Sequence, residues 1–388
     1  MKLVIAPDSF KESLGAAEVA RAIARGWQQA WPETECILLP VADGGEGTVD
    51  ALVAATQGQL ISQSVTGPLG ECVKASWGLS GDGQTAFIEM ASAAGLMLVP
   101  PSLRDPGITT TYGVGELIRA ALDHGARHIV LGLGGSATND GGAGMLQALG
   151  LRWLDAAGKS LPFGGLALAR LASIDVSGLD ARLAQCRFEV ACDVDNPLIG
   201  AQGASVIFGP QKGATPAQVA QLDAALTQYA RVIEQHLGRS IAHTPGAGAA
   251  GGMGAAALAF LQATLRPGIA LVLDTVGLAA HLADADLVIT GEGKLDGQTL
   301  RGKAPLGVAA LARHHGVPVL ALAGSVAADA AALQQHGITA LFSIQPGPGS
   351  LQDALADASA RLETTARNLA TVYRLGLHHA PRDHSSES

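Results

Sequence analysis

The chain has 388 residues, 48% of them hydrophobic and only 4% aromatic, with a formal net charge of −9. This length exceeds the size at which a single hydrophobic core usually stops growing, so two domains are expected. An acidic chain without a basic cluster is a poor partner for nucleic acid or anionic membranes, and no run of apolar residues is long enough to span a bilayer.

We also expect a cytoplasmic protein. Lys2 leads directly into a strand and Asp8 ends the first apolar run too early for a signal peptide. The cysteines show no CxxC spacing and lie mostly in apolar runs, which predicts buried thiols in a reducing compartment: Cys36, Cys72, Cys186 and Cys192.

The chain begins with two β-loop-α units. Short apolar runs predict strands at residues 2–6 and 36–41, and helical spacing predicts helices at about 14–29 and 48–55. This order is typical of a parallel sheet with right-handed crossovers.

A different pattern follows. Residues 60–99 alternate polar and apolar positions in short pieces and predict antiparallel strands. A helix is expected at 113–124, and the stretch 128–150 reads as strand, glycine-rich turn and helix. A strand at 187–192 precedes a helix that begins at Pro216, with a Thr215–Gln218 capping box.

The β/α rhythm resumes after Pro267. Its predicted elements are strands at 287–290, 317–322 and 339–344, a loop at 291–299, and helices at 304–315 and from Ser350 to about 375. Residues 376–388 have too little apolar content to order themselves.

The five parallel-type strands at the two ends of the chain could form one sheet. Residues 1–63 and 267–375 would then make one discontinuous α/β domain, with residues 64–266 inserted as a second domain. Ligand would bind in a cleft between them, near the carboxyl ends of the strands.

The turn after residue 133 has the composition of an anion site. Glycines flank Ser136, Thr138, Asn139 and Asp140, and glycine between a strand and a helix lets backbone N–H groups approach phosphate or carboxylate. The segment also partly matches a dinucleotide fingerprint, with Asp155 about twenty residues on, but its extra polar residues delay the helix. A second glycine match at 246–251 lacks a preceding strand.

Carboxylates stand in the loops after the first two strands. Asp43 and Glu46 fit a helix capping box, and Ser9 with Glu12 repeats that pattern. The same residues beside glycines at strand ends could equally bind a ligand. These two interpretations remain open.

Two later loops carry paired charges. Asp193 and Asp195 would point to one face of an extended chain, where they could hold Mg²⁺ or supply a general base, although an Asx turn before Pro197 is the alternative. Glu292 and Lys294 lie among glycines that permit close approach to a phosphate chain, although surface loops often look similar.

The sequence lacks a Walker A loop, a GxSxG elbow and any metal-binding histidine spacing. What it has is a set of glycine-bearing loops with carboxylates and lysines. Phosphoryl transfer needs these groups, because N–H donors and lysines bind phosphate while carboxylates hold Mg²⁺ and take a hydroxyl proton.

Seven segments in register resemble the bacterial type I glycerate kinases, from Met1 to about Leu375. They are APDSFKES (6–13), LPVADGGEGT (39–48), GGSATNDGGAG (134–144), ACDVDNPL (191–198), FGPQKGA (208–214), PGAGAAGG (245–252) and TGEGKLDGQTLRGK (290–303). The resemblance implies a flavodoxin-like domain with an inserted second α/β domain of mixed sheet. It also implies ATP-dependent phosphorylation of D-glycerate, usually at the 2-hydroxyl, giving 2-phosphoglycerate.

Residue roles follow from chemistry rather than from the resemblance. We expect Asp193 to act as the base, with Asp8 and Lys11 also catalytic, and Asp43 or Asp195 to bind Mg²⁺. Lys11 and Lys212 would neutralise phosphate or the glycerate carboxylate. The predicted binding residues are Ser9, Asp43, Gly44, Gly45, Glu46, Gly134, Gly135, Ser136, Asn139, Asp140, Lys212, Gly291, Glu292, Gly293 and Lys294.

Other functions remain open at this point. Phosphorylation could occur at the 3-hydroxyl or on a related small hydroxy acid. A nicotinamide-dependent oxidoreductase or a sugar-acid sensor would belong to other classes. The oligomeric state has no signature in the sequence.

Overall fold

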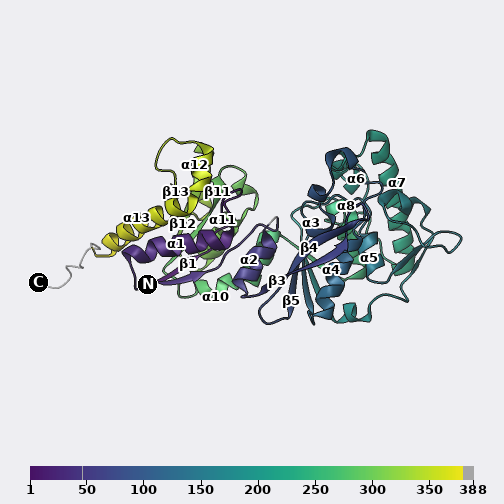
Figure 1. The fold of residues 1–388 in the computed structure, drawn as a ribbon, viewed down its shortest axis with the longest axis horizontal. Helices are drawn as coiled ribbons and strands as arrows, with labels where there is room; N and C mark the ends of the chain where they lie inside the picture. Colours follow the sequence, from purple (N-terminus) through teal and green to yellow (C-terminus); the bar gives the residue numbers. More distant parts are fainter. Residues whose placement is uncertain (46, 379–388) are drawn as a thin grey trace, which may run out of the picture. The chain divides into compact units, whose positions relative to one another are not determined.

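The computed structural model describes residues 1–45 and 47–378, without the side chains of Arg301 and His378. Contacts divide the chain into two compact units (Figure 1). Unit 1 comprises residues 1–43 and 273–388, and unit 2 comprises residues 44–272. None of the described helices has the length and apolarity needed to cross a membrane.

Unit 1 is built on a five-stranded parallel sheet in the order β13-β12-β11-β1-β2. Numbered along the sheet's own strands this is 2-1-3-4-5, the flavodoxin-like order, so the predicted parallel sheet and fold class are confirmed. The strands are β1 (Lys2–Ile5), β2 (Glu35–Leu38), β11 (Leu287–Leu295), β12 (Val319–Val326) and β13 (Ala340–Ser343).

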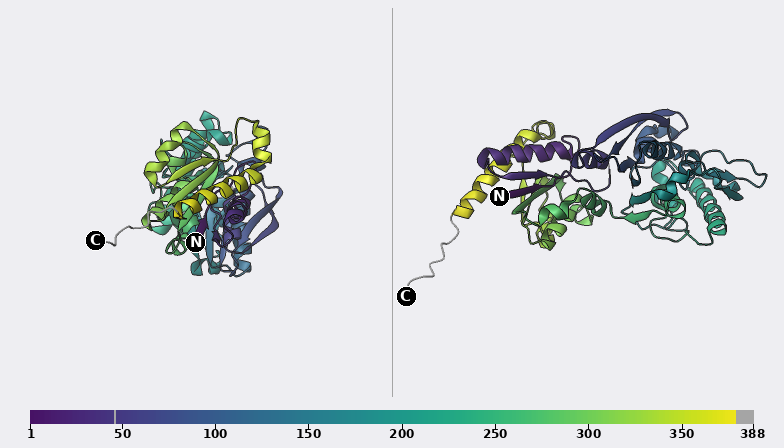
Figure 2. Two further views of the ribbon diagram at one scale, coloured as in Figure 1. Left: turned by 90° about the vertical axis from the view of Figure 1, so that its left-hand side faces the viewer. Right: turned by 90° about the horizontal axis from the view of Figure 1, so that it is seen from below.

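Helices cover both faces of this sheet. Figure 2 shows helices on both sides of the strands. Alternate strand residues such as Leu3 and Ile5 share a core with α1 and α13, so Val4 faces the opposite side. The helices are α1 (Ala16–Ala30), α10 (Leu278–Leu282), α11 (Ala304–His314), α12 (Leu351–Ala356) and α13 (Ala358–His378), with 3₁₀ turns η6 (Thr299–Arg301) and η7 (Ala328–His336). The single helix predicted from Ser350 is therefore two helices, and the second extends past residue 375.

Helices α1 and α13 pack against each other along their length, and Gly26 allows this close approach. A Cβ added at Gly26 would lie 2.1 Å from the Glu363 carbonyl oxygen. We expect Gly26→Ala to lower the free energy of unfolding of unit 1 by about 1–3 kcal/mol, because the helix backbones must separate. Urea unfolding followed by circular dichroism measures this.

The matched control is Gly376→Ala on α13, where no atom lies within 4 Å of the added Cβ. Removing a helical glycine in open space should be neutral or slightly stabilising. Equal destabilisation by the two substitutions would contradict the packing argument.

Unit 2 contains a six-stranded mixed sheet in the order β10-β9-β6-β5-β4-β3. The first four strands are parallel, while β4 pairs antiparallel with both neighbours. The strands are β3 (Gln59–Thr66), β4 (Cys72–Leu79), β5 (Thr85–Glu89), β6 (His128–Gly132), β9 (Arg187–Ala191) and β10 (Thr264–Arg266). A small hairpin pairs β7 (Arg152–Leu154) with β8 (Ser173–Asp175).

The helices of unit 2 enclose one large core that includes Trp77, Trp153 and Tyr229. They are α2 (Thr48–Ala55), α3 (Ala91–Ala94), α4 (Tyr112–Asp123), α5 (Ala143–Ala148), α6 (Ala204–Phe208), α7 (Pro216–Leu237), α8 (Ala249–Phe260) and α9 (Gly268–Thr275), the last ending in unit 1. The short turns are η1 (Leu96–Leu98), η2 (Pro101–Leu103), η3 (Gly165–Arg170), η4 (Ala181–Gln185) and η5 (Pro210–Lys212). The Thr215–Gln218 capping box of α7 is present.

Several predicted elements need correction. Residues 91–98 form α3 and η1 instead of a strand. The predicted loop at 291–299 is strand as far as Leu295, because β12 pairs with it beyond the glycines. The cysteines are not buried as predicted, because Cys72 is exposed at the start of β4 and the other three are half-buried.

The predicted domain boundaries, 63/64 and 266/267, also differ from the bounds of the compact units. Residues 44–63 group with unit 2 because α2 packs on β4 and β5, and because β3 pairs with β4 along its whole length. By its contacts, compact unit 2 begins at Gly44.

Candidate active site

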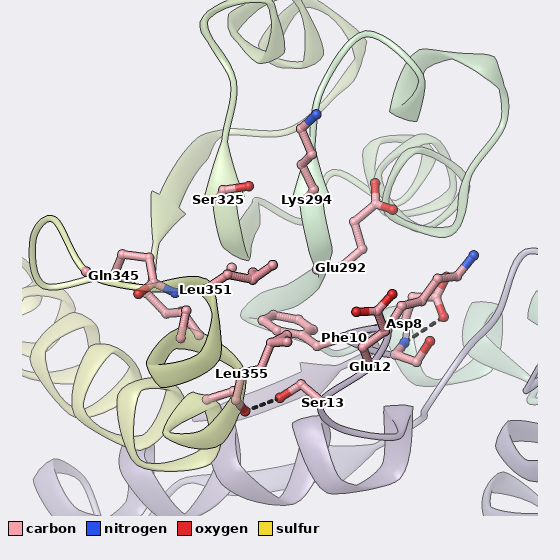
Figure 3. Close-up of a pocket in the computed structure, with 18 of the residues that line it drawn as sticks. Asp8, Phe10, Glu12, Ser13, Glu292, Lys294, Ser325, Gln345, Leu351 and Leu355 are labelled. Atoms are coloured by element: carbon pink, nitrogen blue, oxygen red, sulfur yellow. Dashed lines mark hydrogen bonds between the residues drawn. The ribbon is translucent and has the colours of Figure 1, made fainter.

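A pocket of about 670 Å³ opens in unit 1 (Figure 3). It lies at the carboxyl ends of β1 and β11, where the strand order reverses, and this switch point is where open α/β sheets bind ligands. The two strands are held together there by hydrogen bonds from Thr290 Oγ1 to the Ala6 carbonyl (2.7 Å) and from the Asp8 N–H to the Gly291 carbonyl (2.8 Å).

The pocket brings together seven of the predicted site residues from three separate segments. These residues are Asp8, Ser9, Lys11, Asp43, Glu292, Gly293 and Lys294. Gly291 lies just behind them in β11, where a Cβ would be 2.0 Å from the Leu322 carbonyl oxygen. Glycine is required at this position for strand pairing.

Asp8 is the most perturbed carboxyl group in the pocket. Burial, with a smaller contribution from the negative charges of Asp43 and Glu292, raises its pKa to about 7, although the Ser9 N–H donates to Asp8 Oδ1 at 2.6 Å. A carboxyl group with such a pKa in a pocket indicates a functional site.

Glu292 is held firmly on the neighbouring strand. Its carboxylate accepts hydrogen bonds from Thr299 Oγ1 (2.7 Å) and Lys303 Nζ (3.1 Å). Burial raises the pKa of Glu292, the Asp43 charge adds to the rise, and Thr299 and Lys303 oppose it. The acidic side chains thus occupy one end of the pocket beside Lys303.

The opposite end of the pocket is apolar. In Figure 3, Phe10 lies between the acidic residues and the side chains of Leu351 and Leu355. Ser13 Oγ donates to the Leu355 carbonyl at 2.6 Å, which ties the β1 loop to α12. A pocket with charged groups at one end and apolar groups at the other suits an amphipathic ligand.

A second group of predicted residues meets in unit 2. A Cβ placed on Gly44, which has φ +93°, would lie 2.8 Å from Gly268 Cα and 3.6 Å from Asp193 Oδ2. Asp193 Oδ1 accepts from the Gly268 N–H at 2.9 Å. Gly45 Cα is 3.8 Å from the corresponding Cβ position on Gly134. Gly44 and Gly268 therefore lie beside Asp193, and Gly134 lies beside the same loop at Gly45.

A third group is largely buried. Lys212, 1% exposed, donates from Nζ to Ser136 Oγ (2.7 Å) and to the Thr138 carbonyl (2.6 Å). Burial lowers its pKa to about 7, and the Asp140 charge opposes the shift. Asn139 Nδ2 donates to Ser205 Oγ at 2.9 Å, so Asn139 also faces the interior.

Asp140 is sealed inside unit 2. Its carboxyl group accepts from the N–H groups of Gly142 and Gly144 and from both the N–H and hydroxyl of Thr111. Burial raises its pKa despite these bonds. Four internal donors therefore make Asp140 part of the hydrogen-bond network that holds this loop.

The remaining predicted residues lie apart. Asp195 is exposed on the loop after β9, and Glu46 is outside the described residues. Helices α1 and α2 begin after Gly15 and Gly47, so neither Ser9 nor Asp43 is the N-cap that the sequence allowed. The capping interpretation of these two residues is therefore wrong.

Sequence reasoning missed the apolar half of the pocket and its β13 side. The missed residues are Phe10, Lys303, Ser325, Gln345, Leu351 and Leu355. Lys303 could have been found from its place in the last matching motif. Apolar side chains carry no comparable chemical signal.

The glycine turn after β6 differs in geometry from a dinucleotide-binding turn. Helix α5 begins only at Ala143, after Gly142, so no helix N-terminus follows Gly134 directly. The glycine-rich match at residues 246–251 has no strand leading into it.

A flavodoxin-like unit with lysines and carboxylates at its switch point, joined to a second α/β unit, defines a phosphotransferase that handles small molecules. The sequence profile of the Glycerate kinase family matches residues 3–374, and the chain belongs to this family. Membership of this family makes the protein a kinase and implies that ATP is the phosphate donor.

Individual relatives cover nearly the whole chain. A Bacillus subtilis (strain 168) protein named glycerate kinase is 56% identical, covering 97% of this chain and 98% of its own. The Escherichia coli (strain K12) glycerate 2-kinase is 54% identical, covering 98% and 100%. A crystal structure from Salmonella typhimurium LT2, provisionally described as glycerate kinase 2, has a TM-score of 0.91 at 56% identity and covers 97% and 99%.

Proposed function

We propose that the protein transfers the γ-phosphoryl group of ATP to the 2-hydroxyl of D-glycerate, giving 2-phosphoglycerate and ADP. The observation that carries this proposal is the switch-point pocket of unit 1, with its acidic and lysine-bearing end, in a member of the glycerate kinase family. The name glycerate 2-kinase of the E. coli relative supports the 2-position. A cytoplasmic location goes with a small-molecule kinase whose described cysteines are all free thiols.

We assign the nucleotide to the unit 1 pocket. A volume of about 670 Å³ is within the range of pockets that enclose small ligands. The base would lie against Phe10, Leu351 and Leu355, and the phosphates would point toward Lys294 and Lys303. Lys11, exposed on the β1 loop, would neutralise phosphate charge.

Mg²⁺ fits the acidic end of this pocket. No three acidic, histidine or cysteine side chains of residues 1–45 and 47–378 form a metal-binding group by themselves. Mg²⁺ commonly binds through one or two carboxylates together with substrate phosphates, so Asp43 and Asp8 suffice. Burial is the main cause of the raised pKa of Asp8, and the charges of Asp43 and Glu292 add to it, so a bound cation would offset part of the rise. In unit 2, Asp195 is the alternative Mg²⁺ ligand that the sequence suggests. Bound Mg²⁺ would neutralise charge on the transferring phosphoryl group.

Asp193 is our proposed general base. It lies at the end of β9 in unit 2, and the Gly268 N–H fixes its carboxylate through Oδ1. A positioned carboxylate can take the proton of the attacking hydroxyl.

A coupled assay tests the reaction and the position together. The protein is incubated with ATP, Mg²⁺ and D-glycerate, and enolase is added without a mutase. We expect phosphoenolpyruvate absorbance, because enolase acts on the 2-phosphate. ADP without that signal would move the phosphate to the 3-hydroxyl, and no ADP with any small hydroxy acid would refute the kinase proposal.

A further inference from the structure

The exposed turn at Gly134 and Gly135 in unit 2 has free donor groups. Gly135 has φ +71°, and neither glycine N–H donates a hydrogen bond to any residue that the structure describes. Successive free N–H groups in such a turn form a concavity that binds anions. This feature alone would suit either water or a ligand.

The next residue adds a hydroxyl donor. Ser136 Oγ accepts a hydrogen bond from Lys212 Nζ at 2.7 Å, so the hydroxyl proton is left to donate elsewhere. Lys212 is too deeply buried to reach a ligand itself. It acts as a positioning residue, with its second bond to the Thr138 carbonyl holding the same turn.

Arg104 is the independent observation. Its Nε atom is buried, yet it has no hydrogen-bond partner among the described residues. The neighbouring Asp105 carboxylate is engaged elsewhere, by the Gly107 N–H (2.8 Å) and Gln218 Nε2 (3.2 Å). A buried guanidinium nitrogen without an acceptor calls for an anionic partner.

The backbone brings Arg104 to the turn that carries Lys212. Gly213 has φ +97°, and a Cβ there would lie 2.3 Å from the Arg104 carbonyl oxygen and 2.8 Å from its Cβ. On the other side, the segment leading to Arg104 is bonded to the glycine turn, with the Leu96 N–H donating to the Gly135 carbonyl at 2.8 Å. Arg104, Lys212 and Ser136 therefore belong to one corner of unit 2.

We propose that Arg104, the Ser136 hydroxyl and the Gly134–Gly135 N–H groups form a subsite for the carboxylate of an α-hydroxy acid. The inference rests on the proposed function and adds the place where the acid group of the substrate binds. The same turn lies beside Gly45, and Gly44 lies beside Asp193, so the carboxylate subsite is near the base expected to act on the neighbouring hydroxyl.

A nucleotide phosphate fits this corner less well. Phosphates of ATP bring Mg²⁺, which requires carboxylate ligands, whereas Asp140 points inward and is fully hydrogen-bonded. The nucleotide already has an amphipathic pocket in unit 1. A metal-free cluster of donors is the arrangement that a carboxylate needs.

Arg104→Gln tests the subsite by steady-state kinetics with the full chain. We expect the KM for D-glycerate to rise about ten- to a hundredfold, as for a lost charge-assisted hydrogen bond, with the KM for ATP unchanged. Discrimination between D-glycerate and glycerol, which has no carboxylate, should fall by the same factor. Arg170→Gln is the matched control, because Arg170 is exposed on η3.

Two further variants keep the test independent of folding. Ser136→Ala removes only one oxygen and should also raise the KM for D-glycerate alone. Lys212→Met should raise the KM for D-glycerate as much as Ser136→Ala does. The double variant should raise this KM little further, because both substitutions act through the Ser136 hydroxyl. Full additivity would remove Lys212 from its positioning role.

The outcomes separate this inference from the proposed function. A wild-type protein that phosphorylates no small hydroxy acid would refute the function. An active wild-type protein whose Arg104→Gln and Ser136→Ala variants keep the normal KM for D-glycerate would refute the subsite. A rise in the KM for ATP instead would assign the corner to phosphate.

Discussion

Asp193→Asn is expected to lower kcat for D-glycerate by about 10²- to 10⁴-fold, the usual contribution of a general base. Binding should change little, because asparagine keeps an oxygen that can accept from the Gly268 N–H, as Asp193 Oδ1 does at 2.9 Å. KM for D-glycerate and for ATP should therefore stay close to the wild-type values. Steady-state kinetics with the enolase-coupled assay measures all three constants.

Asp193→Ala provides the contrast. It removes the base and also the acceptor for Gly268, so it should lower both kcat and stability. Asp155→Asn is the control within unit 2, since Asp155 is a half-buried turn residue that accepts from the Ala157 and Lys159 N–H groups. Normal turnover in Asp193→Asn would show that the carboxylate is only a backbone anchor.

Much of the fold could be predicted because its strands are short and buried. Runs such as residues 2–6 and 287–290 carry the continuous apolar pattern of a parallel sheet covered on both faces, and the structure pairs them directly. The α7 cap was predictable for a different reason. A Thr-Pro-x-Gln sequence satisfies the first free N–H groups locally, without help from the rest of the chain.

The errors arose where distant partners decide the conformation. Glycines at 291, 293 and 297 favoured a loop, but β12 supplies hydrogen-bonding partners and extends β11 to Leu295. The grouping of residues 44–63 with unit 2 likewise depends on distant partners, since α2 packs on β4 and β5 and β3 pairs with β4.

The predicted site residues separated into those that face a pocket and those that stabilise a loop. Asp8 and Glu292 could be foreseen because carboxyl ends of parallel strands lie at one edge of a sheet. Asp140 and Asn139 are also polar residues in a glycine-rich loop, yet their polar atoms form hydrogen bonds inside unit 2. Sequence alone does not distinguish these uses, because a buried glycine turn needs donors and acceptors as much as a ligand does.

Asp8→Asn is expected to stabilise unit 1 at pH 8 in metal-free buffer. The pKa of Asp8 is about 7 in the folded protein and 3.8 in the unfolded chain, so the folded state holds this proton more tightly. The stability that Asp8 contributes is complete below pH 3.8 and is lost as the pH rises to about 7. Asparagine avoids that loss, which is on the order of 4 kcal/mol.

Urea unfolding in EDTA at pH 4.5, 6 and 8 measures the effect. The advantage of Asp8→Asn over wild type should grow with pH and level off above about 7, while Glu33→Gln, an exposed control in unit 1, should show no such trend. A constant difference at all three pH values would contradict the raised pKa. If the variant is also less active, the cost in stability identifies Asp8 as a carboxyl group kept for its chemistry, since a structural role does not require a carboxylate buried beside the charges of Asp43 and Glu292.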